Sequence, residues 1–109
     1  MTRRVLHNRR ASETFGLQCA GLAYTCTISR FADGQLAEVF LSNHKGGSHA
    51  HTAVRDAAIA CSLALQHGAD VETLREAVCR DAPSNASGPL GVALDMVAKQ
   101  SEPDVGGRR

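Results

Sequence analysis

Apolar and polar residues alternate with a period of two between Phe15 and Ile28. This alternation predicts a β-hairpin with one buried face and one exposed face. The apolar positions are Phe15, Leu17 and Cys19 before an Ala-Gly turn, and Leu22, Tyr24, Cys26 and Ile28 after it. An Asp-Gly pair in the next turn, FADGQ, accepts the positive φ of a tight connection. The run LAEVFLS that follows predicts a third strand, which completes an antiparallel meander.

The second half of the chain has helical periodicity. A helix is predicted from His51 or Thr52 over TAVRDAAIACSLALQ, and it is apolar nearly all round between Ala57 and Leu65. That composition is typical of a helix buried on several sides. Gly68 predicts its end, and Asp70 is placed to cap a second helix over DVETLREAVCR. The inner stripe expected for that second helix is Val71, Leu74, Ala77 and Val78.

A last helix is predicted to begin at Pro89, after a loop with the sequence DAPSNASGP. Its inward positions are expected to be Leu90, Ala93, Leu94 and Val97. The fold class is therefore α+β, with a three-stranded antiparallel meander followed by three helices. The predicted organisation is a basic N-terminal arm (1–12), a folded domain (13–100) and a disordered tail (101–109).

Composition limits the core and the class of protein. The chain has 109 residues, 43% of them hydrophobic and only 4% aromatic, so one domain must be built mainly from aliphatic side chains. We expect a homo-oligomer, because self-association would bury more apolar surface. No apolar run approaches the roughly 20 residues that cross a membrane, and no secretory signal is recognisable. The four cysteines have no CxxC pairing, which indicates reduced thiols and a cytoplasmic location.

Positive charge is concentrated at the start of the chain. The net charge is +1, and Arg3, Arg4, Arg9 and Arg10 contribute +4 within the first twelve residues, so the remainder carries −3. The body is therefore not a basic platform for nucleic acid. The four arginines are either a solvated start to the chain or a contact for phosphate or for an acidic partner.

The stretch EVFLSNHKGGSHAH contains the strongest candidate for a binding site. It is not a Walker loop, because Lys45 precedes the glycines. Lys45 and the backbone N–H groups of Gly46, Gly47 and Ser48 could nevertheless receive a phosphate at the start of the following helix. Glu38 would then hold Lys45 by an ion pair or contact the sugar of the ligand. The alternatives are an ordinary flexible connection and, for Glu38, the outward position of its strand.

Three histidines in the same stretch raise the question of a metal site. His44, His49 and His51 could supply imidazole ligands in the manner of catalytic zinc. The stretch lacks an HExxH motif or paired thiolates that would fix the geometry. No metal site is therefore predicted, and the sequence leaves open whether these histidines ever bind one.

Five segments then occur in the order known from one family: RRVLHNRR, DGQLAEVFL, HKGG, AIACSLALQHGADVETLREAV and SGPLGVALDMV. Residues 3–98 resemble the TSCPD domain, in the version found near the C-terminus of adenosylcobalamin-dependent ribonucleotide reductases. The chain departs from the family pattern at two places. His7 replaces the usual proline of RxLPxRR. SNASGPL replaces the cysteine-bearing TSCPD string, so the resemblance implies no metal-binding role for a cysteine of this chain. The positions that match are Arg3, Arg9, Arg10, Gly34, Glu38, Lys45, Gly47, Ser62, Leu65, Gly68, Gly88 and Pro89.

The resemblance implies a role in ribonucleotide reduction and deoxynucleotide supply for DNA synthesis. The chain has no cysteine pair to return electrons to a radical site, so we do not expect it to be a complete catalyst alone. The leading hypothesis is a subunit or nucleotide-binding accessory of a ribonucleotide reductase catalytic chain, with adenosylcobalamin implied only by family association. The alternatives are an independent nucleotide- or anion-binding protein and a purely structural oligomeric module.

Overall fold

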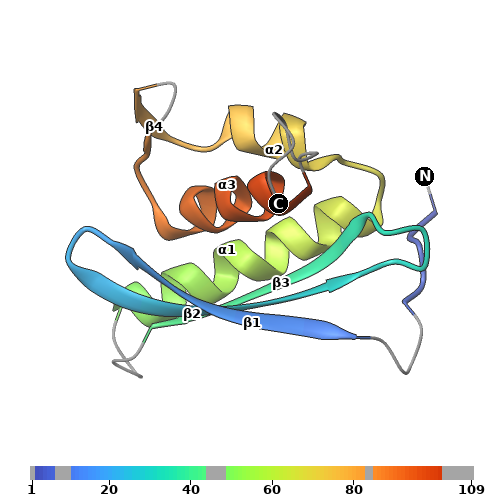
Figure 1. Ribbon diagram of the computed structural model, residues 1–109, viewed down its shortest axis with the longest axis horizontal. Helices are drawn as coiled ribbons and strands as arrows, with labels where there is room; N and C mark the ends of the chain where they lie inside the picture. The colour runs from blue at the N-terminus through green and yellow to red at the C-terminus, as the bar shows by residue number, and fades with distance from the viewer. Residues whose placement is uncertain (1, 7–10, 44–48, 83–84, 102–109) are drawn as a thin grey trace, which may run out of the picture.

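The computed structural model of the chain describes residues 2–6, 11–43, 49–82 and 85–101. The predicted tail lies outside the described residues from 102 onward. The elements, shown in Figure 1, are β1 (Ser12–Cys19), β2 (Leu22–Arg30), β3 (Leu36–Asn43), α1 (His49–Gln66), α2 (Val71–Ala77), β4 (Arg80–Ala82), β5 (Asn85–Ala86) and α3 (Pro89–Ser101).

The first three strands form one antiparallel sheet in the order β1-β2-β3, which confirms the predicted meander and the α+β class. Ala20 and Gly21 both have positive φ, 52° and 78°, so the β1–β2 connection is a two-residue turn whose twist matches its strands. The Asp-Gly turn is also confirmed, because Gly34 has φ 90° and its N–H donates to the carbonyl of Phe31 at 2.9 Å. The predicted alternation is therefore present in the sheet.

All three helices lie on one face of the sheet (Figure 1). The strand positions that point to the opposite face are mostly Thr and Ser. The interior between the layers is apolar, as the alternation requires. The largest of its fully buried side chains come from β2, β3 and α3, and they are Cys26, Ile28, Val39, Leu94 and Val97.

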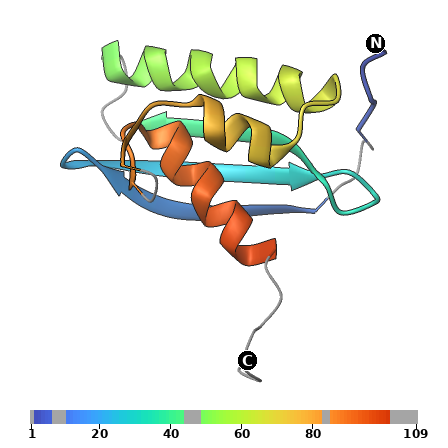
Figure 2. The ribbon, with the colours of Figure 1, turned by 90° about the horizontal axis from the view of Figure 1, so that it is seen from above.

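Helix α1 runs along the outer edge of β3 (Figure 2). The buried Ser62 hydroxyl accepts from the Val39 N–H at 2.9 Å and donates to the Val39 carbonyl at 3.0 Å. One turn further on, Gln66 Nε2 donates to the Ala37 carbonyl at 3.1 Å. Polar side chains of the helix thus satisfy the backbone groups that β3 would otherwise leave unpaired at its edge.

Two predictions for this helix were wrong in detail. It begins at His49, before the expected His51 or Thr52. It is also buried on one side only, since Ile59 and Leu63 are 49% and 41% exposed. The reason is its place at the sheet edge, where one flank contacts β3 and the core and the other has no described element beside it.

Helix α2 begins and ends close to the predicted signals. Gly68 has φ 108°, and Asp70 accepts the Thr73 N–H at 2.7 Å as the N-terminal cap. Val71 and Leu74 pack against the core as expected, whereas Ala77 is exposed and ends the helix. The predicted stripe was therefore one turn too long, because Val78 adopts an extended backbone with ψ 157°.

The segment predicted to be a loop contains a small second sheet instead. β4 and β5 pair antiparallel, with Arg80 opposite Ala86. The chain then enters α3 at Pro89, and Ala93, Leu94 and Val97 are buried as predicted. Among the described residues, no helix has the length and hydropathy needed to cross a membrane.

Candidate functional site

A cavity of about 650 Å³ lies where the N-terminal residues, the β2–β3 turn, the α1–α2 connection and α3 meet. These segments share one end of the molecule in Figure 1. The volume is in the range of small-molecule sites. Its apolar lining includes Leu36, Leu65, Val71 and Val97, and its polar lining includes Arg4, Arg30, Gln35, Asp70 and Glu72.

Arg4 reaches the cavity because the N-terminal residues are bound to the folded body. Its backbone N–H donates to the carbonyl of Gln66 at 2.7 Å, at the end of α1. Its guanidinium lies 3.7 Å from the centroid of the Phe31 ring and donates to Gln35 Oε1 at 3.2 Å and to Asp33 Oδ2 at 3.3 Å. Stacking on the ring and two hydrogen bonds hold the cation at the mouth of the cavity.

Arg3 strengthens the same attachment. Its Nε donates to Oε1 of the buried Gln66, whose amide nitrogen already donates to Ala37. One glutamine side chain therefore joins the N-terminal residues, α1 and β3. Arg3 and Arg4 contact the body of the protein, whereas Arg9 and Arg10 lie outside the described residues.

Arg30 approaches the cavity from the end of β2. The β2–β3 pairing changes register between Ser29 and Arg30, an irregularity that re-aims the side chain at this point. Its Nη1 donates to the Gly34 carbonyl at 3.1 Å. Because Arg4 and Arg30 hold the same short turn, two guanidinium groups converge on one wall, and such groups recognise phosphate or carboxylate.

The opposite rim of the cavity carries acidic groups. The Thr73 backbone N–H that binds the Asp70 carboxylate lowers the pKa of Asp70 below its usual value. Beside the cationic wall, the Gln35 N–H and then Arg4 likewise lower the pKa of Asp33, which pairs with Arg4 and is not itself part of the cavity lining. These carboxylates stay ionised at neutral pH and accept hydrogen bonds from hydroxyl or amino groups. The cavity thus combines a cationic wall, an aliphatic floor and an anionic rim.

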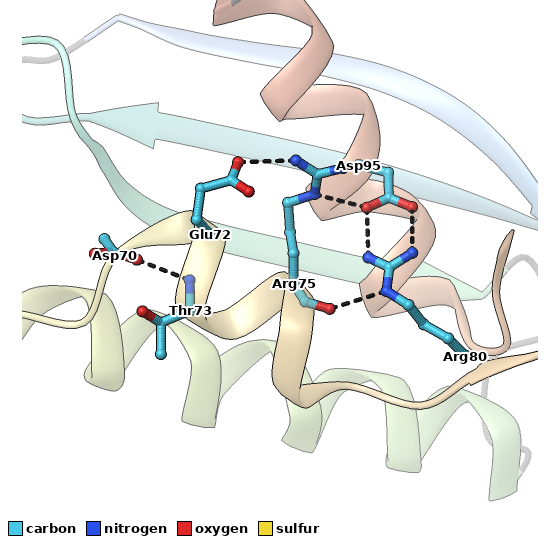
Figure 3. A network of polar contacts seen from close by, with 6 residues as sticks. All are labelled: Asp70, Glu72, Thr73, Arg75, Arg80 and Asp95. Atoms are coloured by element: carbon cyan, nitrogen blue, oxygen red, sulfur yellow. Dashed lines mark hydrogen bonds and ion pairs between the residues drawn. The ribbon is translucent and has the colours of Figure 1, made fainter. Parts of the chain in front are cut away.

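A polar network fixes the helices that form the cavity walls (Figure 3). Asp95 of α3 accepts from Arg80 at 2.7 and 3.0 Å and from Arg75 Nε at 2.8 Å, while Arg75 also pairs with Glu72 at 2.8 Å. The hydrogen bonds from Arg80 are the main cause of the lowered pKa of Asp95. Since this carboxylate joins α2 and β4 to α3, it holds Val71 and Val97 at opposite sides of the cavity.

A second cavity of about 290 Å³ lies between α1 and the start of α3. Tyr24, Val54 and Leu90 line it, and no lysine or arginine is among its lining residues, all of which are described. It therefore lacks the convergent charges of the first cavity. The larger cavity is the better candidate for an anionic ligand.

The loop predicted to bind phosphate lies outside the described residues. It comprises Lys45, Gly46, Gly47 and Ser48, and His44 just before it lies outside them too. Glu38 is half-buried on β3 opposite Ser29, on the sheet face away from the helices.

The structure describes two of the three histidines of this stretch. His49 is the first residue of α1 and is exposed, and His51 is half-buried. Within the described ranges, no three His, Cys, Asp or Glu side chains gather as a metal site would require.

All four cysteines are free thiols. Burial raises the pKa of Cys26 to about 12 and that of Cys61 to about 11, so both stay protonated and unreactive. Their role is core packing, as the sequence predicted. Cys19 donates to the Ser87 carbonyl at 3.6 Å, and the Cys79 carbonyl accepts from the Ser87 N–H at 2.9 Å.

The fold and this cavity together define a small α+β module with a ligand-sized site. The chain is 35% identical over 75 residues to a vitamin B12-dependent ribonucleotide reductase of Agrobacterium fabrum. The aligned part is 69% of this chain and 6% of that protein, so the similarity concerns a small segment of a much longer relative. No family model matches the chain, and no solved structure does.

Proposed function

We propose that the chain is a TSCPD-type module that binds a nucleotide and serves a ribonucleotide reductase as a subunit or accessory. The observation that carries this proposal is the 35% identity with the vitamin B12-dependent enzyme, spread over more than two thirds of the chain. The resemblance of five ordered segments supports it, because they extend over residues 3–98.

The large cavity is the proposed nucleotide site. Its volume of about 650 Å³ is in the range of sites that enclose drug-sized ligands. The phosphate groups would contact Arg4 and Arg30, and the base would lie on the aliphatic floor formed by Leu36 and Leu65. A ribose hydroxyl would donate to Asp70, whose Oδ1 caps α2. Each part of a nucleotide thereby meets a lining of matching chemistry.

Adenosylcobalamin does not fit this site. A corrinoid with its two axial groups is far larger than a nucleotide, and the cavity of about 650 Å³ is at the scale of drug-sized ligands. We therefore derive no step through the cofactor. The proposal for this chain is binding of the nucleotide.

Calorimetric titration with nucleoside diphosphates, nucleoside triphosphates and inorganic phosphate tests the proposal. Arg30→Gln and Arg4→Gln should each weaken nucleotide binding by about tenfold, since a charge-assisted hydrogen bond contributes ~1.5–3 kcal/mol. Arg55→Gln is the matched control, because Arg55 is an exposed arginine of α1 that does not line the cavity. The absence of binding, or equal affinity in all three variants, would contradict the proposal.

An independent nucleotide- or anion-binding protein is the alternative function. It predicts the same titration but no affinity for a reductase. Immobilising the chain and passing a purified vitamin B12-dependent reductase over it separates the two. Retention supports the accessory role, and nucleotide binding without retention supports the independent binder.

A further inference from the structure

The outer flank of α1 and the neighbouring edge of the sheet expose large apolar side chains. Phe40 is 51% exposed, Ile59 is 49% exposed and Leu63 is 41% exposed. They are three of the four most exposed large hydrophobic residues in the described part of the chain. Large apolar side chains exposed on two neighbouring elements indicate an interaction site where they form a continuous surface.

Hydrogen bonds bring the backbones that carry these residues side by side, and Phe40, like Glu38, lies on the sheet face away from the helices. Ser62 is bound to both backbone groups of Val39, and the next residues in the two segments are Leu63 and Phe40. Ile59 precedes Leu63 by one helical turn on the same flank. In Figure 2, α1 lies along one side of the molecule beyond β3, and no other described element covers its outer flank. The patch is therefore open to a partner.

One exposed stripe of α1, continued past its last residue, consists of Asp56, Ala60, Leu63 and His67. These positions follow the spacing i, i+4, i+7 and i+11, which keeps side chains on one helical face. The His67 N–H donates to the Leu63 carbonyl at 3.0 Å, so the helical geometry extends to His67. The stripe has an acid at one end, a base at the other and a small and a large apolar residue between them.

We propose that a second copy of this chain binds this stripe, with the two α1 helices antiparallel about a two-fold axis. Centring that axis between Ala60 and Leu63 places Asp56 of each copy opposite His67 of the other. An imidazole N–H donates to a carboxylate in either protonation state, so both ends of the contact are paired. Ala60 meets Leu63 of the other copy, which lets the helices approach closely.

The same rotation explains the remaining apolar residues. A two-fold axis perpendicular to both helices keeps the β3 flank of each copy on the same side of the pair. Ile59 and Phe40 of both copies then lie together beside the helix contact. An isologous contact of this kind is self-complementary, as closed dimers require. The proposal does not depend on the nucleotide-binding function, although His67 at the end of the stripe directly precedes Gly68, which lines the cavity.

Sedimentation velocity over a range of concentrations tests the dimer. The wild-type chain should dimerise, and Leu63→Glu should weaken the dimer by more than about tenfold, because it places a charge at the centre of the contact. Asp56→Lys and His67→Glu should each weaken it by repulsion across the contact. The double variant, Asp56→Lys with His67→Glu, should recover most of the affinity, because the ion pair is restored with reversed sign.

Glu76→Lys on α2 is the control for a charge reversal on an exposed helix outside the patch, and it should leave the dimer unchanged. Circular dichroism of each variant verifies the fold. A wild-type chain that stays monomeric at millimolar concentration overturns the proposal, even if the patch then binds a reductase chain. A dimer that Leu63→Glu leaves intact, or a double variant without recovery, also overturns it.

Discussion

Gly91 shows how a single residue sets the distance between two segments. It lies in the first turns of α3 and is buried. A Cβ added there would lie 2.7 Å from the Cβ of Ala86 and 3.2 Å from Cγ2 of Val78. The glycine therefore permits α3 to pack closely against β5 and against the residue that follows α2.

Gly91→Ala should destabilise the protein, although alanine is the better helix former by about 1 kcal/mol. The new methyl group meets an atom attached directly to the backbone of β5, and overpacking of this kind costs roughly 1–3 kcal/mol. Urea unfolding should show a net loss of about 1 kcal/mol or more. Adding Ala86→Gly should recover part of it, and Gly16→Ala, which has only an ordinary contact at 3.9 Å, should be neutral or stabilising. A Gly91→Ala protein more stable than wild type would contradict the packing described here.

At the scale of elements, the pairing of α1 with β3 depends on Ser62 and Gln66. Both are buried in a helix that otherwise contributes Ala, Val, Leu and Cys to the core. Their spacing of four residues places them on one line along the helix, facing the edge of β3. The helix thereby takes the place that a fourth strand would occupy.

Ser62→Ala should leave the buried N–H and carbonyl of Val39 without this partner. Leaving a buried polar group unsatisfied costs about 1–3 kcal/mol, so the free energy of unfolding should fall by about 1 kcal/mol or more. Ser42→Ala, a half-buried serine of β3, should change it by less than about 0.5 kcal/mol. Denaturant titration of the two variants measures the difference. Equal stability would show that Ser62 does not maintain the edge.

The elements that the sequence predicts are those with a long, regular pattern. The three strands and three helices follow from alternation, helical periodicity and the turn residues Gly34, Gly68 and Pro89. The small sheet of β4 and β5 could not be predicted, because its strands have three and two residues, drawn from Arg, Asp, Ala and Asn. The exposed flank of α1 was missed because periodicity shows how apolar a helix is but not which neighbours it has.

At the scale of the whole molecule, the candidate site consists of residues that are distant in the sequence. Arg4, Arg30, Asp70 and Val97 come from four different segments, and only the fold brings them together. The basic cluster at the start of the chain was a weak signal for Arg4, and no motif pointed to Arg30. A single sequence displays compact runs of residues, whereas contacts between distant segments are hidden in it. The sequence pattern therefore favoured Lys45 and its glycines as the binding site.

The similarity to the longer reductase concerns most of the molecule. The aligned part of the chain is 6% of the length of that relative, so we propose that it acts in the reduction of ribonucleotides beside a catalytic chain. A module of this size can contribute a binding site, a docking surface or both. The stripe on the outer face of α1 ends at His67, next to Gly68 in the cavity lining, so the two surfaces adjoin at one end of the helix.

Backbone amide NMR during titration with a nucleoside diphosphate locates the ligand, and it therefore tests directly whether the cavity is the nucleotide site. We expect shifts that saturate together around the cavity, at Gly34, Leu36, Gly68 and Val97, with little change at Gly16 on the open face of the sheet. Arg30→Gln should move the same set of shifts at a higher ligand concentration. Shifts confined to Gly46 and Gly47 would place the ligand at the loop instead, and a spectrum that nucleotide leaves unchanged would contradict the proposed function.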